Sequence, residues 1–453
     1  MPTDKCKPEA TRSPESGDQM ENTHPGVVRR LRLDKVRSFD TAEVDFSPRV
    51  TVLLGENGAG KTTIAEMLAL LLVPAAERPQ VSFPLRRGTA QGRAEVFFDA
   101  DDHPAAVWES GNDTGAERRP NPGRPVFAYG RFRQFFTTDQ GERRRINNPA
   151  EDLGDLAHWS RRNSIITLFR PDEQLLQELS RALVALHYGA DTLADPRLGA
   201  VWKRLNASLK TLDCGFERIE IEEGEYEYCP RLLRKKVRLA PNELSDGYQS
   251  VLAMLFDLVL RYAFRFITLP DPLLAAATIV IDEIDLHLNP RWQRTVLAQL
   301  TALFPNTQFI VTTHSPAVVQ AAVDVGHSII SLTESGGVSK VKPLGRNTLR
   351  DLKGAEIGAL LLDRRLFSVG SRYSSEYSAI EDRIDDLESR IESGTATEAD
   401  EKQLFKDLET MQGLMAKDEG RRAEGGLMAQ MADLRRAFLQ DLVELKWEQE
   451  KGA

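Results

Sequence analysis

Short apolar runs separated by polar turns fill residues 28–344. Residues 31–39 alternate between apolar and polar side chains and 50–54 form a continuous apolar run, so both predict strands. Hairpins are expected at 92–110, 216–228 and 326–344, and further buried strands at 278–283 and 306–315. Helical periodicity marks 61–73, 172–188, 197–211 and 246–266. The body of the chain is therefore predicted to mix buried strands with helices.

Beyond residue 351 the pattern becomes helical. Two apolar series with steps of three and four predict a helical hairpin, namely Ile380, Ile384, Leu387 and Ile391, then Leu404, Leu408, Met411 and Met415. A third amphipathic helix is predicted by Met428, Met431, Leu434, Phe438, Leu442 and Leu445. That helix either packs on the first two or presents its apolar face to a partner. Residues 1–25, whose only large apolar side chains are two methionines, are expected to be a disordered leader.

The composition indicates a large chain from a reducing compartment. At 453 residues and 41% hydrophobic side chains, it is long enough for two or three compact units. The cysteines Cys6, Cys214 and Cys229 lack CxxC spacing, so we expect neither a disulfide framework nor a zinc site, and a cytoplasmic location. The sequence shows no apolar run near the roughly 18 residues of a membrane span and no apolar core of a signal peptide. We therefore expect no membrane partner.

The charge is unevenly distributed along the chain. The formal net charge of −9 argues against a protein that coats nucleic acid. However, residues 371–453 hold 20 acidic against 12 basic side chains, whereas the remaining residues hold 48 against 47. The acidity therefore belongs to the helical end, which we predict to dock a protein partner or a second copy.

An arginine-rich segment lies within the neutral body. Residues 115–170 hold 11 arginines against six acidic residues, with Tyr129, Phe132, Phe135, Phe136 and Trp159 between them. Such interleaving is typical of surfaces that contact a nucleic-acid backbone. A solvated insertion with paired arginines gives the same pattern, so DNA contact is one of two open interpretations. The arginines include Arg118, Arg119, Arg131, Arg133, Arg143–Arg145, Arg161 and Arg162.

The most specific motif joins the run 50–54 to the helix that follows. Residues 55–62 read GENGAGKT and match GxxxxGK[ST] at every fixed position. The backbone N–H groups of such a loop wrap phosphates, Lys61 adds a positive charge, and the Thr62 hydroxyl suits Mg²⁺. A glycine turn at a helix start is the alternative, which the flanking strand and helix disfavour. The predicted binding residues are Gly55, Glu56, Asn57, Gly58, Ala59, Gly60, Lys61, Thr62 and Thr63.

Two polar strand ends supply the chemistry that such a loop lacks. The apolar run 279–281 leads to Asp282, suited to Mg²⁺, and Glu283, suited to act as general base. A second run, 309–313, ends at His314, which could bond a γ-phosphate or the attacking water. A solvated strand end and a structural histidine are the ordinary alternatives. Because the carboxyl ends of parallel strands meet at one edge of a sheet, the order of the motifs favours a shared site.

A fourth segment, LSDGYQS at 244–250, precedes the long apolar helix. Taken alone it is a helix cap with Ser245 or Asp246 at the N-cap. Together, GENGAGKTT, LSDGYQS, IVIDEIDLHLNP and TTHSP resemble the ABC-type ATPase heads of the RecF, SMC and OLD families. They are most similar to the single-head ATPases of antiphage operons, such as the Septu and retron-associated ATPases. FAYGRFRQF at 127–135 and SIITLFRPDEQLL at 164–176 resemble segments of the Septu-like group, although Arg131 replaces a proline.

The resemblance implies an α/β fold: an ABC-type P-loop head with a mixed central sheet, an antiparallel β subdomain and an inserted helical subdomain. The head would span residues 26–350, with the inserted lobe at about 74–240, followed by the acidic, coiled-coil-like region 351–453. It also implies ATP and Mg²⁺ as cofactors and a composite site between two heads. Ser245, Asp246 and Gly247 would then contact ATP held by the opposite copy, and Asp285 would lie in the D-loop.

Three classes of function are compatible with an ATPase of this kind. The resemblance favours an ATPase that clamps head to head, senses a trigger in antiphage defence and controls a separate effector, expected to be a nuclease. Nothing in the sequence after the histidine strand resembles a nuclease. The alternative is a RecF/SMC-like ATPase of DNA repair or chromosome maintenance, although the helices that follow the head are short for an SMC arm. A transport ATPase is remote, because the transporter forms of the motifs are missing.

Overall fold

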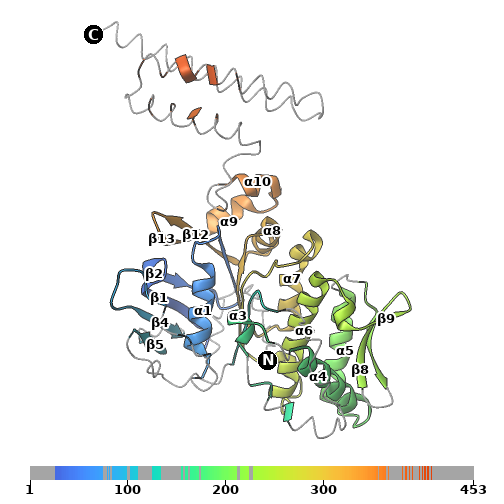
Figure 1. The fold of residues 1–453 in the computed structure, drawn as a ribbon. Helices are drawn as coiled ribbons and strands as arrows, with labels where there is room; N and C mark the ends of the chain where they lie inside the picture. Colours follow the sequence, from blue (N-terminus) through green and yellow to red (C-terminus); the bar gives the residue numbers. More distant parts are fainter. Residues whose placement is uncertain are drawn as a thin grey trace, which may run out of the picture.

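The computed structural model describes residues 26–74, 84–98, 103–110, 125–133, 164–172, 175–211, 215–223, 228–355 and 357–363, with scattered positions between these ranges and on to residue 410. Three sheets and a helical lobe make up most of this part of the chain (Figure 1). Within it, every helix is too short or too polar to cross a bilayer.

The central sheet has six strands in the order β13-β12-β3-β11-β10-β6. They are β3 (Val50–Gly55), β6 (Val126–Tyr129), β10 (Thr278–Ile281), β11 (Gln308–Thr313), β12 (Ser328–Ser335) and β13 (Val338–Pro343). All neighbouring pairs are parallel except β12 and β13. Strands β6, β10 and β11 are fully buried, which explains their continuous apolar runs. The predicted mixed α/β fold is confirmed, but strand β6 was not predicted.

A second, antiparallel sheet has the order β2-β1-β4-β5. Its strands are β1 (Val28–Val36), β2 (Phe39–Asp45), β4 (Arg93–Phe98) and β5 (Ala106–Glu109). Helix α1 (Lys61–Leu72) lies between the two sheets and contacts both, so ten of its 12 residues are buried. This explains why α1 is apolar on nearly every side instead of along one stripe.

The helical lobe lies beside the central sheet, on the right of Figure 1. It contains α4 (Leu175–Asp191), α5 (Pro196–Thr211), α6 (Asp246–Arg265) and α7 (Pro290–Leu303), with the short helices η2 (Pro241–Glu243) and η3 (Pro272–Leu274). The short helix α3 (Ile166–Phe169) lies against β6 of the central sheet. Helix α6 is the spine of this lobe, because every residue from 250 to 264 is buried. Its length and position match the prediction from the apolar pattern.

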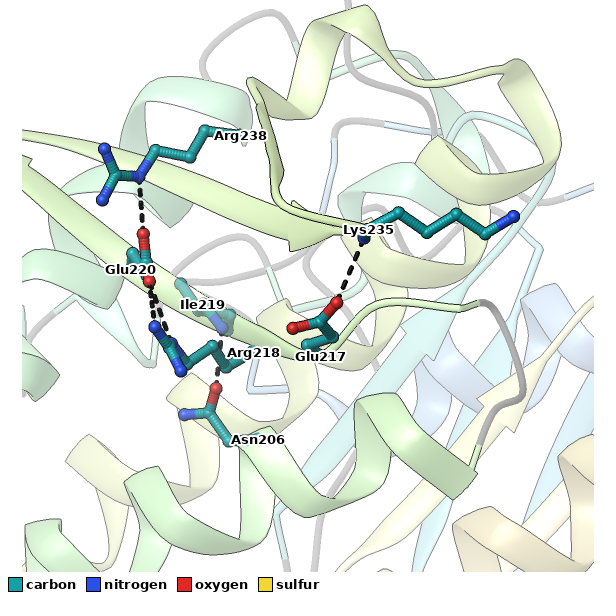
Figure 2. Close-up of polar contacts among 7 residues, drawn as sticks. All are labelled: Asn206, Glu217, Arg218, Ile219, Glu220, Lys235 and Arg238. Atoms are coloured by element: carbon teal, nitrogen blue, oxygen red, sulfur yellow. Dashed lines mark hydrogen bonds and ion pairs between the residues drawn. The ribbon is translucent and has the colours of Figure 1, made fainter.

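A three-stranded sheet, β7-β8-β9, covers the outer side of the lobe. Its strands are β7 (Arg218–Glu223), β8 (Tyr228–Arg234) and β9 (Val237–Leu239). Figure 2 shows Glu220 between Arg218 and Arg238, and the two arginines lower the pKa of this half-buried carboxyl by hydrogen bonding to it. The Asn206 side chain of α5 accepts a bond from the Ile219 N–H at 2.7 Å, which joins sheet and helix. Within the basic run 231–238, Arg231 and Arg238 are thus paired with Glu222 and Glu220.

The helices that follow β11 pack on the central sheet either directly or through one another. Helix α8 (Pro316–Val325) is followed by β12 and β13 and then by α9 (Arg346–Leu352) and α10 (Ile357–Leu362). Beyond these, the described positions between 380 and 410 are helical, apart from Thr397, and Arg383 pairs with Asp407 at 3.2 Å. Ile380, Ile384, Leu387 and Leu404 are buried. The third predicted helix, over 428–445, lies outside the described residues.

One buried side chain joins the two sheets. The Gln308 amide accepts a hydrogen bond from the Val28 N–H at 3.0 Å. It donates to the carbonyls of Val28 at 2.7 Å and Ser47 at 2.9 Å. Gln308 is fully buried, so water cannot replace these bonds.

We expect Gln308→Leu to lower the free energy of unfolding by about 2–4 kcal/mol, because it leaves buried backbone groups of both sheets unpaired. Urea denaturation measures this change. The matched control is Gln320→Leu, since the half-buried Gln320 makes a single bond to the Ala355 carbonyl and should cost at most about 1 kcal/mol. Equal losses in the two variants would contradict the assigned role.

Candidate functional site

The loop 55–60 leaves β3 and enters α1 along a path that requires glycine. Gly60 has a φ of +97°, and a Cβ added there would lie 2.5 Å from the Phe39 ring. At Gly55 an added Cβ would lie 2.3 Å from the Leu332 carbonyl oxygen. Glu56, Asn57 and Gly58 are exposed, so the loop backbone faces solvent at the start of a helix. Such a loop presents its N–H groups to an anion.

Lys61 lies beneath this loop. Its Nζ donates to the carbonyls of Gly55 at 2.8 Å and Glu56 at 2.9 Å. Burial lowers the pKa of the Lys61 ammonium, and the carboxylates of Asp282, Glu283 and Asp285 act in the opposite direction. The cation is therefore held where a phosphate on the loop would meet it.

Thr62 and Asp282 form the oxygen pair of the site. The Thr62 hydroxyl donates to Asp282 Oδ2 at 2.8 Å, and the Thr312 hydroxyl donates to Oδ1 at 2.6 Å. A hydroxyl and a carboxylate are the hard ligands that Mg²⁺ takes alongside phosphate oxygens and water. In the part of the chain that the structure describes, no cluster of three or more His, Cys, Asp or Glu forms a metal site. The Thr62–Asp282 pair thus fits a metal ion that a bound phosphate also coordinates better than a metal ion that the protein alone coordinates.

Glu283 follows Asp282 in an unusual backbone conformation. Its φ is +50°, a left-handed value that costs energy for a residue with a Cβ. The Glu283 N–H donates to Thr312 Oγ1 at 2.7 Å. Next on β11, the Thr313 hydroxyl donates to Asp285 Oδ1 at 2.5 Å. Two adjacent threonines of one strand thus hold the turn 282–285, called the acidic turn below, which carries Asp282, Glu283 and Asp285.

His314 completes this edge of the sheet. It is half-buried, and burial followed by the charge of Lys61 lowers its pKa below the usual value. The imidazole is therefore neutral at neutral pH, with one nitrogen as donor and the other as acceptor. Asp282, Glu283 and Asp285 act on it electrostatically in the opposite direction. The structure thus brings His314, Lys61 and the acidic turn together, as the motif order predicted.

The predicted signature residues lie on a separate surface. Ser245 precedes α6 as its N-cap without a side-chain capping bond, and both Ser245 and Asp246 are exposed. Gly247 packs against the segment after Asp285, because a Cβ added there would lie 2.5 Å from the His287 carbonyl oxygen. Tyr248 stacks edge-on against Trp292 of α7, with ring centroids 4.9 Å apart. The first turn of α6 is thus attached to the segment that follows the acidic turn.

Arg133 is a residue of the site that sequence reasoning misplaced. It was grouped with arginines that could contact DNA, yet it is 2% exposed and bonds the carbonyls of Asp282 and Glu283. Tyr129 is also buried, and its hydroxyl donates to Asp257 at 2.7 Å. Neither residue can contact a nucleic acid. Arg131 and Arg161 are exposed, and Arg118, Arg119, Arg143–Arg145 and Arg162 lie outside the described residues.

The signal for this burial was the run FAY at 127–129, which forms β6 next to β10. The pairing carries the chain directly behind Asp282, whose N–H donates to the Tyr129 carbonyl at 2.8 Å. A polar side chain that follows so closely on a buried strand is itself a candidate for burial.

Two family models match parts of the chain. One, described as "AAA domain, putative AbiEii toxin, Type IV TA system", matches residues 233–320, and another, "AAA domain", matches residues 30–101. Between them they include the phosphate loop, the α6 start, the acidic turn and His314. The family models therefore match the same segments of the chain that carry the sequence motifs.

Curated relatives extend the similarity. The Septu protein PtuA of Bacillus mycoides is 25% identical over 313 residues, which cover 66% of this chain and 39% of that protein. The Retron Vc95 probable ATPase of Vibrio cholerae is 31% identical over 129 residues, which cover 28% of this chain and 25% of that protein. The chain thus spans well under half the length of these two relatives. The predicted resemblance to the Septu and retron ATPases is confirmed.

Two other matches either cover a smaller part of the chain or share less sequence identity with it. The DNA replication and repair protein RecF of Bifidobacterium longum is 42% identical over 76 residues, covering 16% of this chain and 18% of that protein. Among solved structures, an Smc head domain with an extended coiled coil from Pyrococcus furiosus matches with a TM-score of 0.41 and 16% identity, covering 72% of this chain and 98% of that one.

We expect Thr312→Val to disturb the acidic turn, because the variant loses both the donor to Asp282 and the acceptor for the Glu283 N–H. The free energy of unfolding should fall by about 1–3 kcal/mol. The stabilisation that ATP adds in a thermal-shift assay should also depend less on Mg²⁺.

Thr301→Val is the matched control, because the Thr301 hydroxyl bonds only helical carbonyls of α7. It should leave the Mg²⁺ dependence as in the parent chain. A parent-like Mg²⁺ dependence in Thr312→Val as well would refute the assigned role of Thr312.

Proposed function

We propose that this chain, which is related to the ATPases of Septu and retron systems, binds ATP with Mg²⁺ and hydrolyses it. The observation that carries the proposal is the meeting of Lys61, the Thr62–Asp282 pair and Glu283 at the carboxyl edge of a parallel sheet. Ligands of open α/β sheets bind at this edge.

Each group then has a distinct task. The loop N–H groups and Lys61 bind the phosphates, and Thr62 with Asp282 holds Mg²⁺, which would neutralise developing charge on the phosphoryl oxygens. Glu283 accepts the proton of the attacking water, and His314 donates a hydrogen bond to the γ-phosphate from its neutral ring. Thr312 keeps Asp282 and Glu283 in register, since it bonds both.

ATP is expected to join two copies of the chain head to head. The exposed Ser245 and Asp246 and the neighbouring Gly247 are on the start of α6, where their N–H groups are available to an anion from outside. In this arrangement they contact the γ-phosphate held by the opposite copy. Hydrolysis would then release the clamp.

The biological role proposed is control of a separate effector in antiphage defence. The names of the Septu and retron relatives support this role, and the acidic region 371–453 is the proposed dock for the effector, a nuclease, or for another copy. A second candidate, a DNA-repair ATPase, is favoured by the match to RecF. Strong stimulation of ATP turnover by duplex DNA would select this second candidate.

We expect Lys61→Ala to abolish ATP binding, because the phosphates lose the charge beneath the loop. Fluorescence of a labelled ATP measures the affinity, and the exposed Lys210→Ala variant of α5 is the control. Cells that carry the gene with its neighbours should lose phage protection with Lys61→Ala and keep it with Lys210→Ala. Unchanged nucleotide affinity in Lys61→Ala would sink the assignment of the site.

We expect Glu283→Gln to bind ATP but to hydrolyse it at least about 100-fold more slowly, since the general base is lost. The variant should accumulate as an ATP-dependent dimer, which light scattering coupled to gel filtration detects. Glu109→Gln, an exposed position of β5, should behave like the parent chain. A Glu283→Gln variant that turns over ATP at the parent rate would rule out Glu283 as the base.

A further inference from the structure

Arg133 is the largest fully buried side chain in the part of the chain that the structure describes. Its guanidinium donates to the carbonyl oxygens of Asp282 at 2.8 Å, Glu283 at 2.5 Å and Gly130 at 3.3 Å. Its Nε donates to Ser250 Oγ of α6 at 3.2 Å. All four acceptors are neutral, so the residue is not explained as half of a hydrogen-bonded ion pair.

A buried charge of this kind is costly and needs a compensating field. Removing an ion from water costs several kcal/mol, which neutral acceptors offset only in part. The carboxylates of Asp282, Glu283 and Asp285 supply the field, since their charges favour the protonated guanidinium. The cation therefore lies against the backbone of the acidic turn.

The two shortest bonds hold the backbone on both sides of the Glu283 Cα. Glu283 has a φ of +50°, and its N–H is fixed by Thr312. With the carbonyls of residues 282 and 283 bonded to one planar guanidinium, the turn cannot relax toward an ordinary φ without breaking a buried bond. The direction in which the Glu283 side chain leaves the backbone is set by these contacts.

The same guanidinium reaches the helix that bears the signature residues. Ser250 is fully buried and lies on α6, one turn after the exposed residues Ser245 and Asp246. Gly247 and Tyr248 attach the same helix turn to His287 and Trp292, which follow the acidic turn. Helix α6 is therefore connected to the acidic turn and to the segment after it at two places.

We propose that Arg133 is a positioning residue that orients Glu283 for catalysis and couples its orientation to the position of α6. The inference rests on the proposed ATPase function. In the clamped dimer, contact of the opposite nucleotide with the start of α6 would set Glu283 through Ser250 and Arg133. Glu283 would thus be oriented for catalysis only when the second copy is bound.

The test compares Arg133→Lys with the parent chain and with Arg161→Lys, an exposed arginine outside the site. Lysine keeps the charge but cannot serve four acceptors with one planar fork. We expect kcat to fall by about 100-fold, the contribution of a well-placed general base, with KM and the affinity for ATP changed less than about threefold. Parent-like kcat in Arg133→Lys would overturn the proposal.

Combination with Glu283→Gln separates positioning from a general structural role. If Arg133 acts through Glu283, Arg133→Lys should cause no further loss of rate in a Glu283→Gln chain. Equal fold losses with and without Glu283 would contradict the proposal, and so would loss of ATP affinity in parallel with kcat.

Ser250→Ala provides a milder variant should Arg133→Lys fold poorly. It removes only the link to α6, so kcat should fall several-fold with ATP-dependent dimerisation retained, and a parent-like kcat would refute the coupling. Failure of the proposed ATPase function itself would give a different result. The ATP turnover of the parent chain would then be no higher than that of the Lys61→Ala variant.

Discussion

The Asp282 carboxylate accepts hydrogen bonds from Thr62 of α1 at 2.8 Å and from Thr312 of β11 at 2.6 Å. The backbone of the same residue bonds the Tyr129 carbonyl of β6 and the Arg133 guanidinium. Asp282 thereby holds together the phosphate loop, strands β10 and β11, and the segment after β6. The positions of Lys61 and Glu283, the proposed phosphate-binding and catalytic residues, depend on this junction, because they are the chain neighbours of the residues that form it.

Buried charges connect the junction to the helical lobe. Asp257 of α6 accepts bonds from Tyr129 and from Arg261, each at 2.7 Å, and the Arg261 guanidinium stacks over Trp159 at 4.7 Å from the ring centroid. Arg133 bonds the same helix at Ser250. Apolar side chains would pack these positions with less desolvation cost. The polar contacts instead fix the register of α6 against β6 and the segment after it, which matters if the start of α6 serves the nucleotide of another copy.

The charge of the chain has a different meaning in its different parts. The net charge of −9 resides almost wholly in residues 371–453. On the described surface, the arginines of β7–β9 are largely paired with glutamates, as Figure 2 shows for Glu220. Such surface pairs contribute little stability, but they neutralise the charges of Arg218, Arg231 and Arg238. Charge counted along the sequence is therefore a poor guide to which arginines are available to a ligand.

The sequence by itself determined the elements whose signals are local. The phosphate loop is a contiguous motif, and α6 and the runs ending at Asp282 and His314 are long or strongly apolar, so their type follows from neighbouring residues. Strand β6 has four residues and no periodicity of its own, and only its pairing with β10 makes it a strand. Likewise, Arg133 resembles its exposed neighbour Arg131 in the sequence. Tertiary structure alone decided that one faces solvent and the other lies behind Glu283, because burial depends on which distant segments pack around a residue.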